Sequence, residues 1–65
     1  MEVSIYSKPN CVFCDKAKIK LQKHNPKIYM LDMDYNRNDF FKKFPHAKTF
    51  PQIIINNELV GGYHE

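Results

Sequence analysis

The sequence lacks the features that mark membrane and exported proteins. None of its apolar runs approaches the roughly 20 residues that a membrane-spanning helix needs. Its N-terminus has no basic start, long apolar centre or small-residue cleavage site, so we expect no signal peptide, no membrane contact and a cytoplasmic location. Repeats, linkers and low-complexity tracts are also missing, and a hydrophobic fraction of 43% predicts one packed domain, residues 1–65.

Arginine is nearly absent, since Arg37 is the only one in the chain. The net charge of +3 therefore comes mainly from lysines, several of which fall between residues 16 and 27. Basic nucleic-acid surfaces usually interleave cations with aromatic residues, and this stretch does not. We interpret these lysines as the solvated face of an amphipathic helix and expect no nucleic-acid partner.

Cysteine is scarce as well, and its two occurrences carry most of the functional information. Cys11 and Cys14 follow a short apolar segment and begin a run with helical apolar spacing, which places a dithiol at a helix N-terminus. The unpaired N–H groups and partial positive charge there favour a thiolate, so Cys11 is the candidate nucleophile. Cys14 lies one turn further in, and we interpret it as the resolving thiol. In a reducing compartment an isolated C-x-x-C is more often catalytic or metal-binding than structural.

The first half of the chain predicts a strand, a helix and a second strand. Val3 and Ile5 alternate with polar residues, which indicates a strand over residues 1–7. The helix should end at Asn25-Pro26, because the residue before proline avoids helical geometry. Residues 27–34 are apolar on both faces, which predicts a strand buried between layers. The predicted inner face of the helix consists of Phe13, Cys14, Ala17 and Leu21.

The second half predicts a short helix and a hairpin. Asn36 or Asn38 is a suitable N-cap for a helix that Pro45 closes. Gln52 to Ile55 is the strongest strand signal, and Asn56-Asn57 fits a tight turn before a returning strand at Leu59-Val60. The predicted inner face of the short helix consists of Phe40, Phe41 and Phe44. This order of elements indicates the α/β class.

Three motifs in this order resemble those of the glutaredoxins. They are the run from Lys8 to Cys14, then Thr49-Phe50-Pro51 before a strand, and Gly61-Gly62 after the next strand. The family usually has Pro-Tyr between its cysteines and Val before the second-motif proline, so Val12, Phe13 and Phe50 are departures. The compact length and the Val12-Phe13 dipeptide are most similar to glutaredoxins of phages and other large DNA viruses, for which the location would be the host cytoplasm.

The resemblance implies a thioredoxin-like fold, with a four-stranded mixed sheet in the order 2-1-3-4 and flanking helices. The first two strands would be parallel, and the third antiparallel to the first. The family normally continues into a final helix over one sheet face. The sequence shows no counterpart of that helix, so we expect a sheet without it.

The resemblance also implies where glutathione binds. Pro51 matches the family's cis-proline, whose preceding backbone pairs with a bound thiol peptide. Lys8 and Lys43 match positions near the glycine carboxylate of glutathione. Gly62 begins a segment that receives the γ-glutamyl carboxylate, in which Glu65 replaces the usual aspartate. The full implied set is Lys8, Phe13, Lys43, Thr49, Phe50, Pro51, Gly62, Tyr63, His64 and Glu65.

The implied activity is glutathione-dependent thiol-disulfide exchange on protein disulfides and glutathionylated proteins, with ribonucleotide reductase as one partner that the family suggests. A second hypothesis is a non-catalytic carrier, in which two chains hold an iron–sulfur cluster through Cys11 and glutathione. Zinc binding by the cysteines with His24, His46 or His64 does not follow a finger spacing. We therefore expect no metal. The resemblance implies glutathione as co-substrate.

Overall fold

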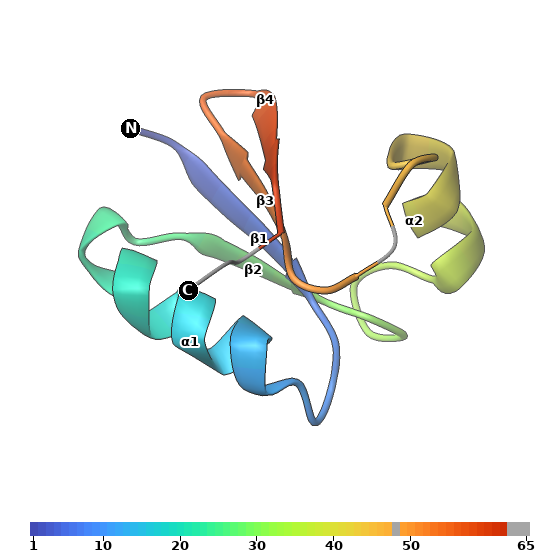
Figure 1. The fold of residues 1–65 in the computed structure, drawn as a ribbon, viewed down its shortest axis with the longest axis horizontal. Helices are drawn as coiled ribbons and strands as arrows, with labels where there is room; N and C mark the ends of the chain where they lie inside the picture. Colours follow the sequence, from blue (N-terminus) through green and yellow to red (C-terminus); the bar gives the residue numbers. More distant parts are fainter. Residues whose placement is uncertain (48, 63–65) are drawn as a thin grey trace.

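The structure is a computed structural model that describes residues 1–47 and 49–62. Its sheet has four strands in the order β2-β1-β3-β4, as predicted. None of the described helices combines the length and the apolar character that crossing a bilayer requires. The elements in chain order are β1 (Val3–Ser7), α1 (Val12–Leu21), the 3₁₀ turn η1 (Gln22–His24), β2 (Lys27–Met30), α2 (Arg37–Lys43), β3 (Gln52–Ile55) and β4 (Glu58–Gly61) (Figure 1).

Strand β1 is central in the sheet. Ile5 lies opposite Ile28 of the parallel strand β2 and opposite Ile53 of the antiparallel strand β3. Strand β4 returns antiparallel to β3. The predicted βαβ unit and the predicted hairpin are thus both confirmed, and the fold is thioredoxin-like.

The two helices pack on opposite faces of this sheet. Val3, Ile5 and Ile53 are buried on one face, where they pack with Ala17 of α1. Tyr6 alternates with Ile5 and points to the other face, where its ring centroid lies 5.0 Å from that of Phe44, just after α2. Strand β1 therefore contributes side chains to both faces of the sheet, and packing on each face holds its C-terminal end. The loop that follows this end leads to Cys11.

The local signals for caps and turns are confirmed. Asn36 caps α2, with its side-chain oxygen accepting a hydrogen bond from the Asp39 backbone N–H at 2.8 Å. Asn25 adopts a left-handed conformation with φ of 49° just before Pro26. Asn56 and Asn57 have φ values of 51° and 66°, as a tight hairpin with two positive-φ residues requires.

Three predictions of burial are wrong. Strand β2 is not buried between layers: it is an edge strand that pairs only with β1, and Ile28 is 37% exposed. Phe13 is 48% exposed and Phe41 is 43% exposed. Each ring sits one residue from an inward-facing residue, Cys14 or Phe40, and one residue along a helix turns a side chain by about 100°. The inward line of α1 therefore passes through Cys14 and not Phe13.

Candidate active site

The two cysteines form the start of α1, as predicted. Cys11 is the N-cap, and its Sγ accepts a hydrogen bond from the Cys14 backbone N–H at 3.1 Å. The two residues form a disulfide, with their Cα atoms 5.2 Å apart. Cys14 is fully buried, whereas Cys11 is partly exposed. An incoming thiol or disulfide therefore reaches Cys11 and not Cys14.

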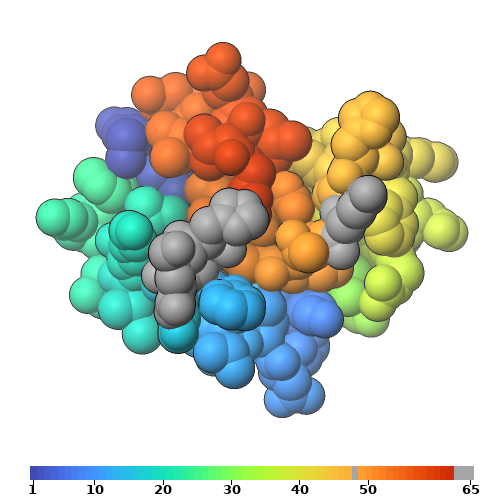
Figure 2. Space-filling model, in the orientation of Figure 1, coloured from blue at the N-terminus to red at the C-terminus, as the bar shows by residue number. Residues whose placement is uncertain are grey.

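The loop before β3 lies against Cys11. The Phe50-Pro51 peptide bond is cis, as the resemblance implied, and the Phe50 carbonyl oxygen lies 3.9 Å from Cys11 Sγ. Figure 2 shows the orange surface of this loop and of β3 between the blue start of α1 and the yellow α2. The backbone that the family uses to pair with a thiol peptide thus lies next to the sulfur that would react.

Gln52 is a residue that the sequence interpretation missed. Its side chain is buried and donates a hydrogen bond from Nε2 to the Thr49 carbonyl oxygen at 2.8 Å, across the cis-proline. This bond closes the loop that holds the Phe50 carbonyl in place. The available signal was a polar residue at the head of three isoleucines, directly after the Thr49-Phe50-Pro51 motif.

An aromatic cluster supports the same loop from the side of α2. The Phe50 ring stacks on Phe40, with centroids 4.6 Å apart, and Phe40 stacks on Tyr35, with centroids 5.7 Å apart. The Tyr35 hydroxyl donates a hydrogen bond to the Ser7 carbonyl oxygen at 2.7 Å. Burial, together with the neighbouring Tyr6 and Asp32, raises the pKa of Tyr35 to about 12. Tyr35 is a second supporting residue that the sequence interpretation did not identify.

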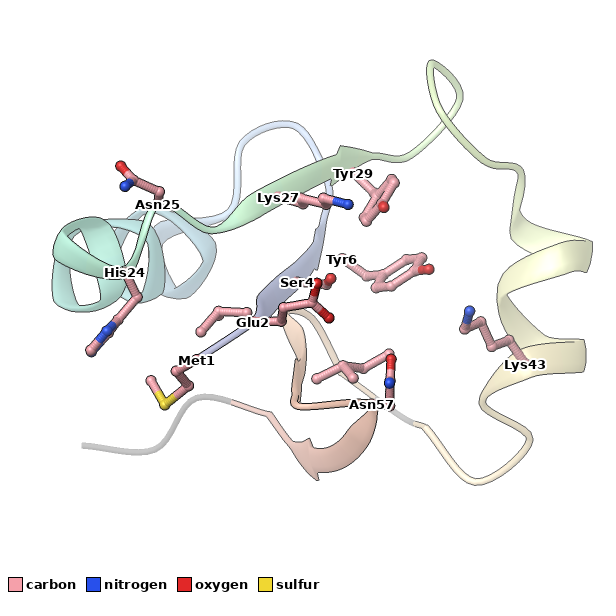
Figure 3. A pocket seen from close by; sticks show the side chains of 12 residues that line it. Met1, Glu2, Ser4, Tyr6, His24, Asn25, Lys27, Tyr29, Lys43 and Asn57 are labelled. Carbon is pink, nitrogen blue, oxygen red and sulfur yellow. The ribbon is translucent and has the colours of Figure 1, made fainter.

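The two predicted carboxylate-binding lysines occupy different places. Lys8 Nζ lies 5.6 Å from the centroid of the Phe50 ring, beside the cis-proline loop. Lys43 Nζ lies 5.5 Å from the centroid of the Tyr6 ring. Figure 3 looks into a hollow of about 310 Å³ on this face of the sheet, toward which Lys43 points from α2, while Lys27 and Tyr29 enter it from β2.

A second hollow, of about 350 Å³, brings together three residues that the resemblance implied. Lys43, Thr49 and Gly62 all line it. A Cβ atom at Gly62 would lie 3.2 Å from Thr49 Oγ1 and 3.3 Å from the Pro51 carbonyl oxygen, so a larger residue would require these neighbours to shift by a few tenths of an ångström. Among the described residues that line this second hollow, neither Lys8 nor Phe13 is found. Tyr63, His64 and Glu65, which complete the implied glutathione set, lie outside the described residues.

The histidine positions bear on the zinc hypothesis. His24 lies in η1, beyond the far end of α1, and a ten-residue helix separates it from Cys11 by about 15 Å. Within residues 1–47 and 49–62, no three His, Cys, Asp or Glu side chains come together as a metal site would require. His64 is among the residues outside the described ranges.

Known proteins of one family are similar to this chain. A family model described as Glutaredoxin matches residues 3–60. Glutaredoxin-2 of Schizosaccharomyces pombe is 36% identical over 66 residues, which cover 92% of this chain and 59% of that protein. The mitochondrial monothiol glutaredoxin-S15 of Arabidopsis thaliana is 37% identical over 67 residues, covering 92% and 40%. The chain thus spans about three-fifths or less of the length of these relatives.

A solved structure is also similar. Glutaredoxin 1 from Francisella tularensis, crystallised in complex with cacodylate, superposes with a TM-score of 0.76 at 27% sequence identity. The superposition covers 94% of this chain and 81% of that one.

Proposed function

The chain belongs to the glutaredoxin family, and from this premise we propose that it catalyses thiol-disulfide exchange with glutathione as the reductant. The observation that carries the proposal is the unequal exposure of two linked cysteines. Cys11 is accessible at the helix start beside the Phe50 carbonyl, and Cys14 is buried behind it. A dithiol arranged this way has one attacking sulfur and one resolving sulfur.

In the reduced protein, the Cys11 thiolate attacks one sulfur of a substrate disulfide. A new S–S bond forms to Cys11, the substrate S–S bond breaks, and the leaving sulfur takes up a proton. The Cys14 thiolate then attacks Cys11 Sγ and releases the second substrate thiol, leaving the Cys11–Cys14 disulfide. Two glutathione molecules restore the dithiol: the first forms a mixed disulfide with Cys11, and the second displaces it as oxidised glutathione. Two electrons pass from glutathione to the substrate in each cycle.

The helix start supports the first step. The Cys14 backbone N–H that reaches Cys11 Sγ at 3.1 Å would stabilise a negative charge on that sulfur. Near neutral pH, a larger fraction of Cys11 would therefore be in the thiolate form than of a free cysteine.

Glutathione would lie along the cis-proline loop. In this proposal its backbone pairs with that of Phe50, and its glycine carboxylate meets the Lys8 ammonium beside the loop. The hollow lined by Lys43, Thr49 and Gly62 accepts the rest of the tripeptide. The segment from Tyr63 to Glu65 would complete the contact with the γ-glutamyl carboxylate.

The test is turnover of a glutathione mixed disulfide by the purified protein. Activity is followed as NADPH oxidation coupled through glutathione reductase, with thioredoxin reductase as the alternative source of electrons. The proposal predicts activity only with the glutathione system. Equal activity with thioredoxin reductase alone, or none with either, would overturn it.

We also propose a cellular location and a class of protein substrates. We place the protein in the cytoplasm, where reducing conditions keep a C-x-x-C pair available for catalysis. Its substrates would be glutathionylated proteins and protein disulfides, ribonucleotide reductase among them. Reduction of an oxidised ribonucleotide reductase by this protein and glutathione tests that partner directly.

A second candidate function is iron–sulfur cluster binding, for which the same exposure of Cys11 is the favouring observation. A monothiol glutaredoxin is among the relatives, and Cys14 is too buried to act as a ligand in the described conformation. Each chain would then offer one thiolate, and two chains with two glutathiones would supply four sulfurs to one cluster. Protein purified without oxygen separates the two functions. Visible absorption bands with bound iron favour the carrier, whereas colourless protein with full turnover favours the enzyme.

A further inference from the structure

The Phe50 ring lies between a cation and a buried aromatic ring. Lys8 Nζ is 5.6 Å from its centroid, and the Phe40 ring is stacked on it at 4.6 Å with an interplanar angle of 24°. Phe50 also directly precedes Pro51, the proline of the cis peptide bond. An aliphatic side chain at this position has no π face and could make neither of these ring contacts.

The contacts of Phe50 form a circuit that leads back to Lys8. Phe40 is 2% exposed and stacks on Tyr35, whose hydroxyl is bonded to the Ser7 carbonyl at 2.7 Å. Ser7 is the residue before Lys8, so the circuit returns to the lysine through the backbone. It therefore links the end of β1, the loop before α2 and the cis-proline loop. Phe50 therefore contacts a buried ring, Phe40, and an exposed cation, Lys8.

We propose that Phe50 is a positioning residue that holds the Lys8 ammonium beside the cis-proline loop and thereby increases the affinity for glutathione. This inference rests on the proposed function, because it assigns the glycine carboxylate of glutathione to Lys8. A lysine side chain has four rotatable bonds, and ordering it on binding opposes the contact. Contact with the ring orders it beforehand. An ammonium has three N–H donors, so the one in contact with the ring still has donors for a carboxylate.

The free protein provides the first test. Protons over an aromatic face are shifted upfield in NMR spectra, so the ε-methylene of Lys8 should resonate upfield of the other lysine ε-methylenes. The signal is assigned by its loss in Lys8→Met. The shift should disappear in Phe50→Leu and persist in Phe41→Leu, whose ring also contacts Phe40 but is not the one under Lys8. An unshifted Lys8 signal in the wild-type protein would overturn the proposal without any variant of Phe50.

Kinetics with a glutathione mixed disulfide provide the second test. Phe50→Leu should raise the KM for glutathione about two- to fivefold, as expected for loss of one exposed cation–π contact, with kcat unchanged. Phe50→Tyr keeps the ring and should restore the wild-type KM. Phe41→Leu should leave both constants unchanged. A fall in kcat with an unchanged KM would show that Phe50 acts on the chemistry of the sulfur, contrary to the proposal.

A double-mutant cycle separates positioning from general loosening of the loop. Lys8→Met should raise the KM for glutathione, and adding Phe50→Leu should raise it little further, because the lysine that the ring places is already gone. Additive effects would mean that Phe50 and Lys8 act independently and would refute the proposal. If the wild-type protein has no glutathione-dependent turnover, the proposed function fails, whereas an active wild type with additive effects means that only this inference fails.

Discussion

The Cys14 backbone N–H donates a hydrogen bond to Cys11 Sγ at 3.1 Å, although Cys14 itself is fully buried and Cys11 is partly exposed. One residue therefore plays two parts in the proposed chemistry. Its amide would stabilise the attacking sulfur, and its side chain would resolve the intermediate. The first turn of α1 contains both functions because the N-cap geometry brings residue i+3 back to the cap.

Replacing Cys11 and replacing Cys14 should have different effects on thiol-disulfide exchange activity. Cys11→Ser should abolish all exchange, because it removes the only accessible attacking sulfur. Cys14→Ser should retain turnover of glutathione mixed disulfides, since a second glutathione can resolve the Cys11 intermediate, and should lose most reduction of protein disulfides. Both are measured with the coupled glutathione reductase assay. An active Cys11→Ser with a dead Cys14→Ser would reverse the assignment.

Gln52 should matter more than an exposed glutamine. Gln52→Leu removes the part-buried hydrogen bond to the Thr49 carbonyl oxygen, which should cost about 1 kcal/mol of the free energy of unfolding. For a domain of this size that corresponds to a fall in Tm of at least about 4 °C. Gln22→Leu, the same change at an exposed position, is the matched control. Equal melting temperatures for the two variants would show that the buried bond contributes little.

Ionisation of Tyr35 should lower the free energy of unfolding at alkaline pH. Its pKa is raised from 10.0 to about 12 by burial, so the unfolded chain loses this proton at lower pH than the folded one. The resulting stabilisation is complete below pH 10 and is lost as the pH rises through 12. Tyr35→Phe removes the hydrogen bond to Ser7 and should cost about 1 kcal/mol near neutral pH.

The measurement for Tyr35 is denaturant unfolding of the wild-type protein and Tyr35→Phe between pH 7 and 12. The stability difference should shrink as the pH rises from 10 to 12. The difference in absorbance at 295 nm between the two folded proteins should titrate with a midpoint near 12. A midpoint near 10 would contradict the burial of this hydroxyl.

Gly62 leaves little room for a side chain beside the cis-proline loop. In Gly62→Ala the new methyl group would lie 3.2 Å from Thr49 Oγ1 and 3.3 Å from the Pro51 carbonyl oxygen, so both neighbours must move by a few tenths of an ångström. We expect a loss of about 1 to 3 kcal/mol in stability and a raised KM for glutathione. Thr49→Ala in the same chain removes the nearer contact and should restore part of the stability.

Gly61→Ala is the control for that prediction. Gly61 has a φ of 98° and open space around its Cβ position, so alanine there should destabilise through backbone strain without crowding the loop. If Gly62→Ala raised the KM no more than Gly61→Ala, crowding of the loop would not be the cause.

Burial was predicted well along the centre of the sheet and poorly at its margins. The apolar run at residues 28–31 reads as a buried strand, but β2 has a neighbour on one side only, and Ile28 is 37% exposed. Which strand forms an edge depends on the order of pairing, and local composition carries no record of that order. Phe13 and Phe41 were also predicted wrongly. Both are apolar, as residues on the buried face of a helix usually are, but their positions around the helix axis turn them partly toward solvent. The likeness to viral glutaredoxins stays a prediction.

The sequence by itself determined the elements whose physics is local. The helix start at the two cysteines, an asparagine cap at position 36 or 38, the Asn56-Asn57 turn and the strand at Gln52 to Ile55 each depend on residues within a few positions of one another. The motif match added the cis bond at Pro51. Only the tertiary structure decided what surrounds Cys11: the Gln52 bond across the loop, the stacking of Phe40 on Phe50, and Lys8 over that ring. Each of these depends on how segments up to 42 residues apart meet, which is set by sheet order and helix packing and not by any neighbouring residue.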